Sequence, residues 1–251
     1  DISDWQNIME AKSNAKAKIK IGMVGKYEDF KDSYISLSEA LRHAGFKVSS
    51  EIEIVYVESE EIQKKGTKGL DELDAILIPG GFGDRGIEGM IQSIEFARLN
   101  RVPFLGICLG MQAAVIEYTR NVLNLKDANS TEFNQKTKAP VIALITEWLN
   151  GDGSLENRDE DSDLGGTMRL GAQECQLQKG TLARSVYGKD SVFERHRHRY
   201  EFNSNYREQL EEKELVFSGF SKDGLAEMIE IKDHPWFIGC QFHPEFTSSP
   251  L

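Results

Sequence analysis

Long apolar runs are missing from this chain of 251 residues, and none approaches the roughly 20 residues that span a bilayer. The polar segment 1–18 also lacks the apolar core of a signal peptide. Cysteine is scarce: Cys108, Cys175 and Cys240 occur, none in a C-x-x-C pair. This pattern argues against a disulfide scaffold or a zinc ribbon and favours a reducing compartment. We therefore expect a cytoplasmic protein without a membrane partner.

Basic residues are in the minority. Lys and Arg number 30 against 41 Asp and Glu, which gives a formal net charge of −11. Because an acidic surface repels phosphates, we expect no nucleic-acid partner, although a local basic cluster could bind a small anion. A P-loop motif is also absent from the sequence. With 39% hydrophobic residues, the composition is that of an ordinary folded protein, long enough for one large α/β domain.

Strand and helix patterns alternate along the sequence, which predicts an α/β fold. We expect an open, mostly parallel sheet flanked by helices on both faces, with additional antiparallel strands in the C-terminal half. The predicted strands are Ile19–Val24, Ile52–Val57, Leu73–Ile78, Pro103–Ile107, Met168–Leu170, Cys175–Leu177, Leu215–Phe220, Glu227–Ile231 and Phe237–Gln241. The predicted helices are Ser33–Ala44 with a stop at Gly45, Gly89–Leu99 and Leu109–Tyr118.

Two segments do not fit the alternating pattern. Residues 1–18 have little apolar periodicity, so we expect ordered structure from Ile19 and interpret 1–18 as an interdomain linker before a domain over 19–251. A start at Asp1, not at methionine, suggests an excised fragment. Asn150–Gly166 is acidic and rich in Gly, Ser and Asn, which predicts a long surface loop of the kind that often forms a lid.

The segment around Cys108 carries the strongest chemical signal. Residues 104–111 read FLGICLGM, a short apolar strand followed by the pattern Gly-x-nucleophile-x-Gly and a helix. Cys108 at a helix start would have its thiolate stabilised by the helix dipole, and the Leu109 N–H could face a developing oxyanion. The competing interpretation is a buried core cysteine.

Two other predicted strand ends carry compatible groups. Phe237–Gln241 runs into Phe-His-Pro-Glu, so the Glu245 carboxylate could orient the His243 imidazole toward Cys108. The glycine-rich turn PGGFGDRG follows Leu73–Ile78, and its glycines could complete an oxyanion hole or cradle a phosphate.

The remaining histidines and cysteines receive weaker interpretations. His196 and His198 have a spacing compatible with metal binding, but three interleaved arginines would repel a cation. An arginine pocket for a carboxylate is the better reading of this segment, so we expect no metal. His43 and His234 look structural, and Cys175 and Cys240 look like inert core thiols.

These motifs together resemble the class I (triad) glutamine amidotransferases. The segments Lys26-Tyr27, ANSTEF at 128–133, GGTMRLG at 165–171, ERHRHRY at 194–200 and HPWF at 234–237 resemble in particular the glutaminase domain of CTP synthases, and DISDW at 1–5 resembles the linker of that family. The resemblance covers Ile19 to Leu251.

The resemblance implies a division of roles among the residues. Cys108 would be the nucleophile, with His243 and Glu245 completing the triad. Residues matching glutamine-binding positions are Gly80, Gly81, Leu109, Gly110, Met111, Gln112, Glu132 and Arg199. Arg199 would pair with the α-carboxylate of L-glutamine, and Glu132 and Gln112 with its α-ammonium and other polar groups.

The resemblance also implies partners outside this segment. Family members pass ammonia to an N-terminal synthetase domain that aminates UTP to CTP with ATP and Mg²⁺, and the full-length enzyme forms a homotetramer. No cofactor is expected in this domain, and residues 165–171 resemble a lid associated with the allosteric effector GTP. Three alternatives stay open: another cysteine hydrolase or γ-glutamyl peptidase, a catalytically silent regulatory module, and a chaperone- or protease-like relative.

Overall fold

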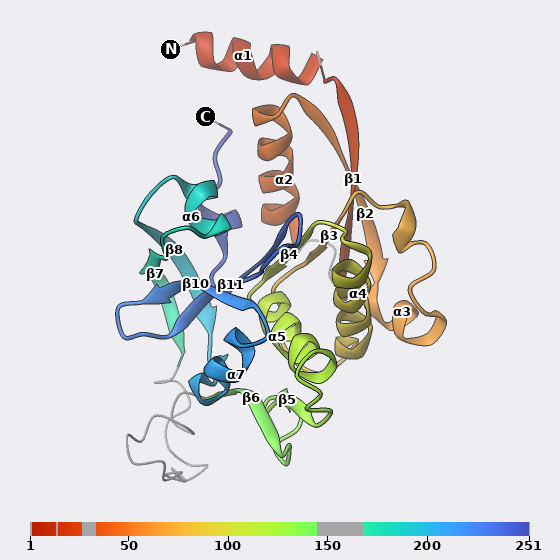
Figure 1. The fold of residues 1–251 in the computed structure, drawn as a ribbon. Helices are drawn as coiled ribbons and strands as arrows, with labels where there is room; N and C mark the ends of the chain where they lie inside the picture. The colour runs from red at the N-terminus through yellow and green to blue at the C-terminus, as the bar shows by residue number, and fades with distance from the viewer. Residues whose placement is uncertain (1, 14, 27–33, 145–167, 251) are drawn as a thin grey trace.

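The computed structural model describes residues 2–13, 15–26, 34–144 and 168–250. A nine-stranded sheet runs through the molecule, with helices on both faces (Figure 1). In spatial order its strands are β2 Ser50–Glu58, β1 Ala17–Gly25, β3 Ala75–Ile78, β4 Phe104–Ile107, β12 Phe237–Cys240, β11 Ala226–Ile231, β10 Leu215–Ser221, β7 Arg169–Leu177 and β8 Ser191–His198. A smaller sheet contains β5 Ala128–Ser130, β6 Ala139–Leu144 and β9 Tyr200–Phe202.

The large sheet is mixed. From β2 to β12 the neighbouring strands are parallel, and from β12 to β8 they are antiparallel. The α/β class and the antiparallel C-terminal strands were therefore predicted correctly, whereas "mostly parallel" describes only the first half. The short strands β3, β4 and β12 are nearly fully buried, as expected for central strands covered on both faces.

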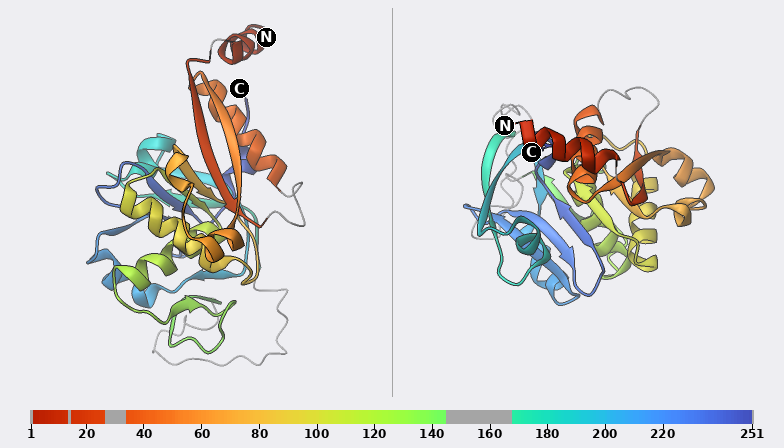
Figure 2. Two further views of the ribbon diagram at one scale, coloured as in Figure 1. Left: turned by 90° about the vertical axis from the view of Figure 1, so that its right-hand side faces the viewer. Right: turned by 90° about the horizontal axis from the view of Figure 1, so that it is seen from above.

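Helices cover the two faces of the sheet. The α-helices are α1 Ile2–Ser13, α2 Ile35–Lys47, α3 Ser59–Lys65, α4 Ile87–Asn100, α5 Leu109–Asn121, α6 Leu182–Tyr187 and α7 Arg207–Glu211. The 3-10 helices are η2 Leu70–Glu72, η5 Ser204–Tyr206 and η6 Pro244–Thr247. Figure 2 shows α2 and α4 on opposite sides of β1 and β2. Two apolar clusters fill the faces, one with α4, α5 and α7, the other with α2 and α6.

Several sequence predictions need correction. Ordered structure begins before Ile19, because α1 forms a helix over Ile2–Ser13. The helix α2 does not stop at Gly45 but continues to Lys47, and Gly45 is needed there because a Cβ would lie 2.8 Å from the Ser50 carbonyl oxygen. The two short strands expected at 168–170 and 175–177 form the single strand β7.

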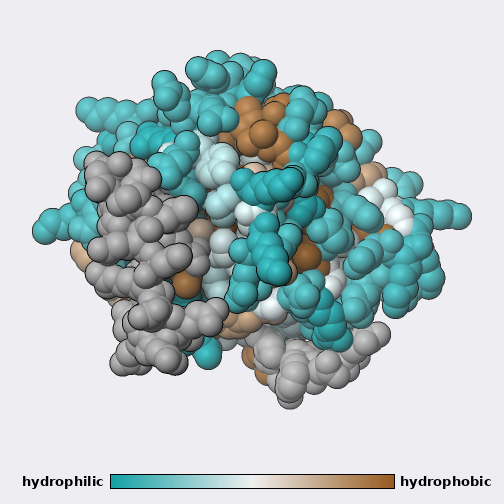
Figure 3. Space-filling model, turned by 90° about the horizontal axis from the view of Figure 1, so that it is seen from below, coloured by the Kyte–Doolittle hydropathy of each residue, from teal (hydrophilic) through white to brown (hydrophobic). Residues whose placement is uncertain are grey.

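The predicted lid loop Asn150–Gly166 lies outside the described residues, as do Ser33 and the first residues of the GGTMRLG segment, 165–167. No helix in the described ranges is long and apolar enough to cross a membrane. The face seen in Figure 3 is mostly hydrophilic, in keeping with the charged composition.

Candidate active site

Cys108 lies on a strained turn between β4 and α5. Its backbone has φ 51° and ψ −102°, a conformation that a residue with a Cβ adopts only when its surroundings impose it. A Cβ on Gly106 would lie 2.7 Å from the Gly110 backbone, and one on Gly110 would collide with the Ile78 carbonyl oxygen. The two glycines therefore permit the close crossing of strand and helix that the sequence pattern predicted.

The Cys108 thiol is buried, with 3% of the residue exposed. Burial raises its pKa to about 12, while a hydrogen bond from the Leu109 N–H acts in the opposite direction. Burial and the helix-start N–H therefore act on the thiol pKa in opposite directions, and burial has the larger effect. A nearby base would assist loss of the thiol proton.

The strand β12 brings His243 to the same edge of the sheet. It lies parallel to β4 with Cys240 opposite Ile107, and the Cys108 N–H donates to the Cys240 carbonyl at 2.7 Å. Beyond the strand, the His243 N–H donates to the Arg195 carbonyl at 2.8 Å, which ties this turn to β8. The register of two parallel strands therefore fixes where both chain segments leave the sheet.

His243 and Glu245 form a hydrogen-bonded pair, with 2.8 Å between Nδ1 and Oε1. Glu245 belongs to η6, and this helix is held by a 2.6 Å hydrogen bond from Thr247 to Glu194. Because a carboxylate accepts, Nδ1 of His243 carries the proton and Nε2 is free to act as a base.

Gly80 marks the point where three segments converge. A Cβ built on this glycine would lie 2.6 Å from Cε1 of His243 and 3.5 Å from Cβ of Cys108. The imidazole and the cysteine thus contact the same backbone position after β3, on one side of the sheet. The absence of a side chain at position 80 leaves room for the imidazole beside the cysteine.

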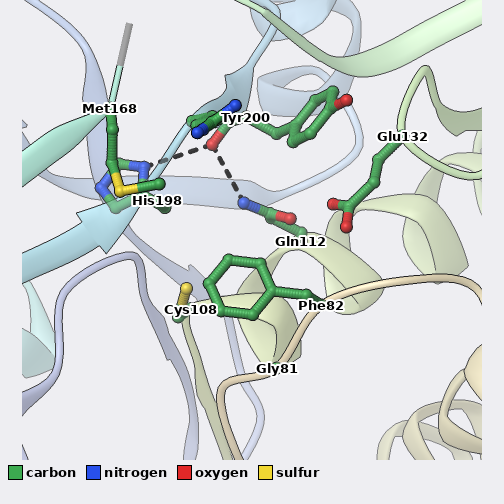
Figure 4. Close-up of a pocket in the computed structure, with 9 residues that line it drawn as sticks. Gly81, Phe82, Cys108, Gln112, Glu132, Met168, His198 and Tyr200 are labelled. Carbon is green, nitrogen blue, oxygen red and sulfur yellow. Dashed lines mark hydrogen bonds between the residues drawn. The ribbon is translucent and has the colours of Figure 1, made fainter. Parts of the chain in front are cut away.

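A cavity of about 320 Å³ opens beside Cys108 (Figure 4). Its lining comes from five regions of the chain: Gly81, Phe82, Cys108, Gln112, Glu132, Met168, His198, Arg199 and Tyr200. Of the residues predicted to bind substrate, Gly81, Gln112, Glu132 and Arg199 line this cavity.

The other predicted substrate-binding residues, Gly80, Leu109, Gly110 and Met111, do not line the cavity. Leu109 and Met111 are buried in the core at 1% and 0% exposure, and Gly110 packs on Ile78. Residues 109–112 were named because they match glutamine-binding positions of the family, and of these four only Gln112 lines the cavity, since one face of a helix reaches it. Leu109 still faces the site through its backbone N–H.

The loop after β3 is anchored by two charged side chains. Glu132 accepts a hydrogen bond from the Gly83 N–H at 2.7 Å, and burial raises the pKa of its carboxyl group. Lys26 donates to the carbonyls of Phe82 and Gly83 at 2.9 and 2.8 Å, and burial lowers the pKa of its ammonium. These contacts hold the glycine-rich turn in place beside the cavity.

Two glutamine side chains link the cavity wall to the sulfur. Gln112 Nε2 donates to the Tyr200 carbonyl at 3.0 Å and to Gln241 Oε1 at 3.2 Å. Gln241 Nε2 in turn lies 3.6 Å from the Cys108 sulfur. Gln112 therefore uses its amide donors within the protein, and Figure 4 shows its oxygen on the side of Glu132. The sequence analysis assigned Gln241 no role beyond ending a strand.

The alternation of β8 separates its basic residues. His196 and His198 are buried, whereas Arg195 and Arg197 point to the exposed face. Arg195 and Arg197 therefore lie on the face of β8 away from the histidines, and not beside them as the sequence prediction assumed. The cation that approaches these histidines is Arg169, whose guanidinium lies 2.7 Å from Glu227 in the same cluster.

The remaining predictions about isolated residues agree with the structure. His43 pairs with Ser248 at 2.9 Å and His234 with the Ala97 carbonyl at 3.2 Å, both as structural contacts. Cys175 and Cys240 are buried.

The family profile described as Glutamine amidotransferase class-I matches residues 29–251. The chain belongs to this family. Among solved structures it is similar to the glutaminase domain of Trypanosoma brucei CTPS with bound acivicin, at 34% identity, with 92% of this chain and 88% of that one covered and a TM-score of 0.81. This match confirms the resemblance to CTP synthase glutaminase domains.

Two other solved glutamine amidotransferases share the fold. A glutamine amidotransferase from Thermotoga maritima aligns at 14% identity over 90% of this chain and 76% of its own, with a TM-score of 0.53. A glutamine amidotransferase from Methylobacillus flagellatus aligns at 13% identity over 91% and 70%, with a TM-score of 0.51.

Proposed function

We propose that the chain hydrolyses L-glutamine to glutamate and ammonia through a triad of Cys108, His243 and Glu245. The observation that carries this proposal is the convergence at Gly80 of a buried thiol and an imidazole held by a carboxylate. The thiol opens onto a cavity whose polar lining matches a free amino acid.

The reaction would begin with the neutral thiol. His243 Nε2 takes the proton as the Cys108 sulfur forms a bond to the carboxamide carbon. The N–H of Leu109 and one from the Gly80-Gly81 turn stabilise the oxyanion, and a single such donor is typically worth about 3 kcal/mol. The C–N bond breaks as the imidazolium protonates the departing ammonia. Water, deprotonated by His243, then attacks the thioester, and the sulfur regains a proton as glutamate leaves.

Side chains of opposite charge in the cavity lining support an amino acid substrate. The Arg199 guanidinium suits the α-carboxylate, because its planar fork binds carboxylates in a bidentate manner. The Glu132 carboxyl group lines the same cavity and suits the α-ammonium. A γ-glutamyl peptide would share these groups, so a peptidase is the second candidate.

We further propose that the ammonia serves CTP formation in a synthetase domain that aminates UTP with ATP and Mg²⁺. The 34% identity to a CTPS glutaminase domain supports this assignment. A linker role for residues 1–18, a homotetrameric full-length enzyme, a cytoplasmic location and GTP regulation through residues 165–171 remain predictions of the same resemblance.

Ammonia release from L-glutamine tests the proposal directly. We expect turnover by the chain, loss of turnover in Cys108→Ser, and retention in the matched control Cys175→Ser, since both thiols are buried but only Cys108 borders the cavity. A glutamine-mimicking electrophile such as acivicin should add once, at Cys108, as judged by intact mass. Turnover that persists in Cys108→Ser would exclude this mechanism.

A substrate panel and a partner separate the alternatives. Preference for a γ-glutamyl peptide over free glutamine would favour the peptidase, and the lack of both turnover and adduct would favour a silent module. Addition of a CTP synthase synthetase domain, with and without GTP, measures the coupling. CTP labelled with ¹⁵N from amide-labelled glutamine is the expected product.

A further inference from the structure

A buried charge cluster lies behind the cavity wall. Arg169, at the start of β7, places its NH1 2.9 Å from Glu201 on β9 and 2.7 Å from Glu227 on β11. Glu201 is 1% exposed and Glu227 0% exposed. The second oxygen, Oε2, of each carboxyl group has no hydrogen-bond partner among the described residues. The cluster therefore joins three strands through two buried carboxyl groups.

The formal charges in this cluster do not balance without a proton. One guanidinium faces two carboxylates, and a second uncompensated negative charge in a buried site is costly. Burial, with the neighbouring Glu227 adding to it, raises the pKa of Glu201 to about 8, and burial also raises the pKa of Glu227. The neighbouring imidazoles of His196 and His198 do not supply the charge, because burial lowers the pKa of both. One proton on either carboxyl group restores neutrality.

The two histidines connect the cluster to the cavity. His198 Nδ1 lies 3.3 Å from the Tyr200 carbonyl and 3.4 Å from Glu201 Oε1, so this nitrogen carries the proton. Its Nε2 then accepts from His196 Nδ1, at 2.8 Å, and His196 Nδ1 also lies 3.6 Å from Glu227. A single neutral tautomer of each ring satisfies these contacts.

The chain of contacts continues to the nucleophile. The Tyr200 carbonyl accepts hydrogen bonds from both His198 and Gln112. Gln112 also donates to Gln241, and the Gln241 amide in turn donates to the Cys108 sulfur. A second route runs through the backbone, since the Gln241 N–H donates to the Glu227 carbonyl at 2.8 Å. Displacing the cluster would therefore displace both the cavity wall and the donor to the sulfur.

A metal ion is a poor occupant of this place. His196, His198 and Glu227 offer ligand atoms within 4.8 Å of one another. However, the Arg169 guanidinium contacts the same carboxyl group of Glu227, and a divalent cation would lie against this positive charge. The Arg169 guanidinium and one proton already neutralise the two carboxylates that a metal cation would otherwise neutralise.

We propose that Arg169, Glu201 and Glu227 are positioning residues for catalysis, which together hold one proton and fix the Cys108 sulfur and the Gln112 amide through His198 and Gln241. The inference rests on the proposed hydrolysis of glutamine. It predicts that charge balance in the cluster, and not either carboxyl group alone, controls the rate.

Charge-balanced and charge-unbalanced variants test this idea in the whole chain. Glu201→Gln and Glu227→Gln each replace one carboxyl group by a neutral isostere, so kcat and KM should stay within about threefold of wild type. The double variant leaves Arg169 without an anion, and Arg169→Met leaves two acids without a cation. Each of these should lower kcat/KM by at least about tenfold. The triple variant R169M/E201Q/E227Q is neutral again and should recover at least about fivefold over R169M.

The readouts separate this inference from the proposed function. Alkylation of Cys108 by iodoacetamide needs no glutamine pocket, and its rate should fall in the unbalanced variants and return in the triple variant. Glu39→Gln with Glu211→Gln is the matched control, because it removes two exposed paired carboxylates and should change nothing. A wild type that alkylates but does not turn over glutamine would refute the proposed function and leave the cluster testable by alkylation.

Three results would overturn the positioning role. One is additive, independent effects of the two Glu→Gln changes. Another is a triple variant whose kcat/KM and alkylation rate are no higher than those of Arg169→Met, or which does not fold. The third is one equivalent of bound transition metal, measured in the purified chain and lost in Glu227→Gln.

Discussion

The side-chain amide of Gln241 lies 3.6 Å from the sulfur of Cys108, and its oxygen accepts a hydrogen bond from Gln112. Both partners of this contact are buried. A donor aimed at sulfur favours the thiolate, whereas burial raises the thiol pKa. The hydrogen bond from Gln241 thus counteracts the effect of burial on the Cys108 thiol as the thiol loses its proton.

Gln241→Met should slow the proposed reaction without unfolding the chain. Methionine has a similar length but no N–H, so the developing thiolate loses one hydrogen bond. A bond to a charged group contributes about 1.5–3 kcal/mol, which predicts a fall in kcat of roughly 10- to 100-fold. The pH profile of Cys108 alkylation should move to higher pH. An unchanged alkylation profile would show that the amide does not act on the sulfur.

Gly80→Ala should abolish turnover while leaving the core intact. The new methyl would lie 2.6 Å from Cε1 of His243, so the imidazole must move away from the cysteine. We expect a loss of at least about a hundredfold in kcat, the usual scale for general acid–base catalysis. Circular dichroism and thermal unfolding are the controls, and a fully active variant would contradict the packing at this point.

The ion pair between Arg98 and Glu117 provides a stability prediction away from the site. Glu117 is fully buried and accepts from Nε and NH2 of Arg98, with distances from 2.6 to 3.2 Å. Glu117→Ala leaves Arg98 partly buried and unpaired, which should lower the unfolding free energy by about 3–5 kcal/mol. The control Glu39→Ala breaks an exposed pair and should cost no more than about 1 kcal/mol in urea unfolding.

The pH dependence of stability should report the proton on Glu201. The pKa of this carboxyl group is about 8 in the folded chain against 4.5 ordinarily, so the folded state binds the proton more tightly than the unfolded state. The stabilisation of the folded state that comes from this proton is fully present below pH 4.5 and is lost as the pH rises through 8. One proton gives a slope no steeper than about 1.4 kcal/mol per pH unit.

Glu201→Gln removes this titrating group. Between pH 5 and 8, the slope of the unfolding free energy against pH should therefore be smaller in the variant than in wild type, by up to about 1.4 kcal/mol per pH unit. Glu39→Gln is again the exposed control. Urea unfolding across the pH range measures the difference, and parallel profiles for wild type and Glu201→Gln would show that Glu201 is ionised throughout.

The convergence of Cys108, His243 and the glycine-rich turn could be predicted because each follows a short apolar strand. Parallel strands place their carboxyl ends at one edge of a sheet, so local patterns were enough to bring distant residues together. Arg199 and Glu132 were named through the family resemblance, and both line the cavity.

Contacts that depend on strand order could not be predicted in this way. The cluster of Arg169, Glu201 and Glu227 forms only because β7, β9 and β11 meet, and nothing local marks those residues as partners. The two-residue period of β8 was available in the sequence and would have separated its histidines from Arg195 and Arg197. The helix end predicted at Gly45 was wrong, because in a sequence a glycine required by close packing cannot be distinguished from one that ends a helix.

The position of β12 has a consequence for biosynthesis. This strand comes after all other strands of the nine-stranded sheet in sequence, yet it lies between β4 and β11, where the parallel and antiparallel halves join. A growing polypeptide on the ribosome therefore exposes two unpaired edges until that late segment emerges. Cys108 is translated long before His243, so an incomplete chain would lack one member of the proposed triad, and its open strand edges would make it a target for aggregation or chaperone capture.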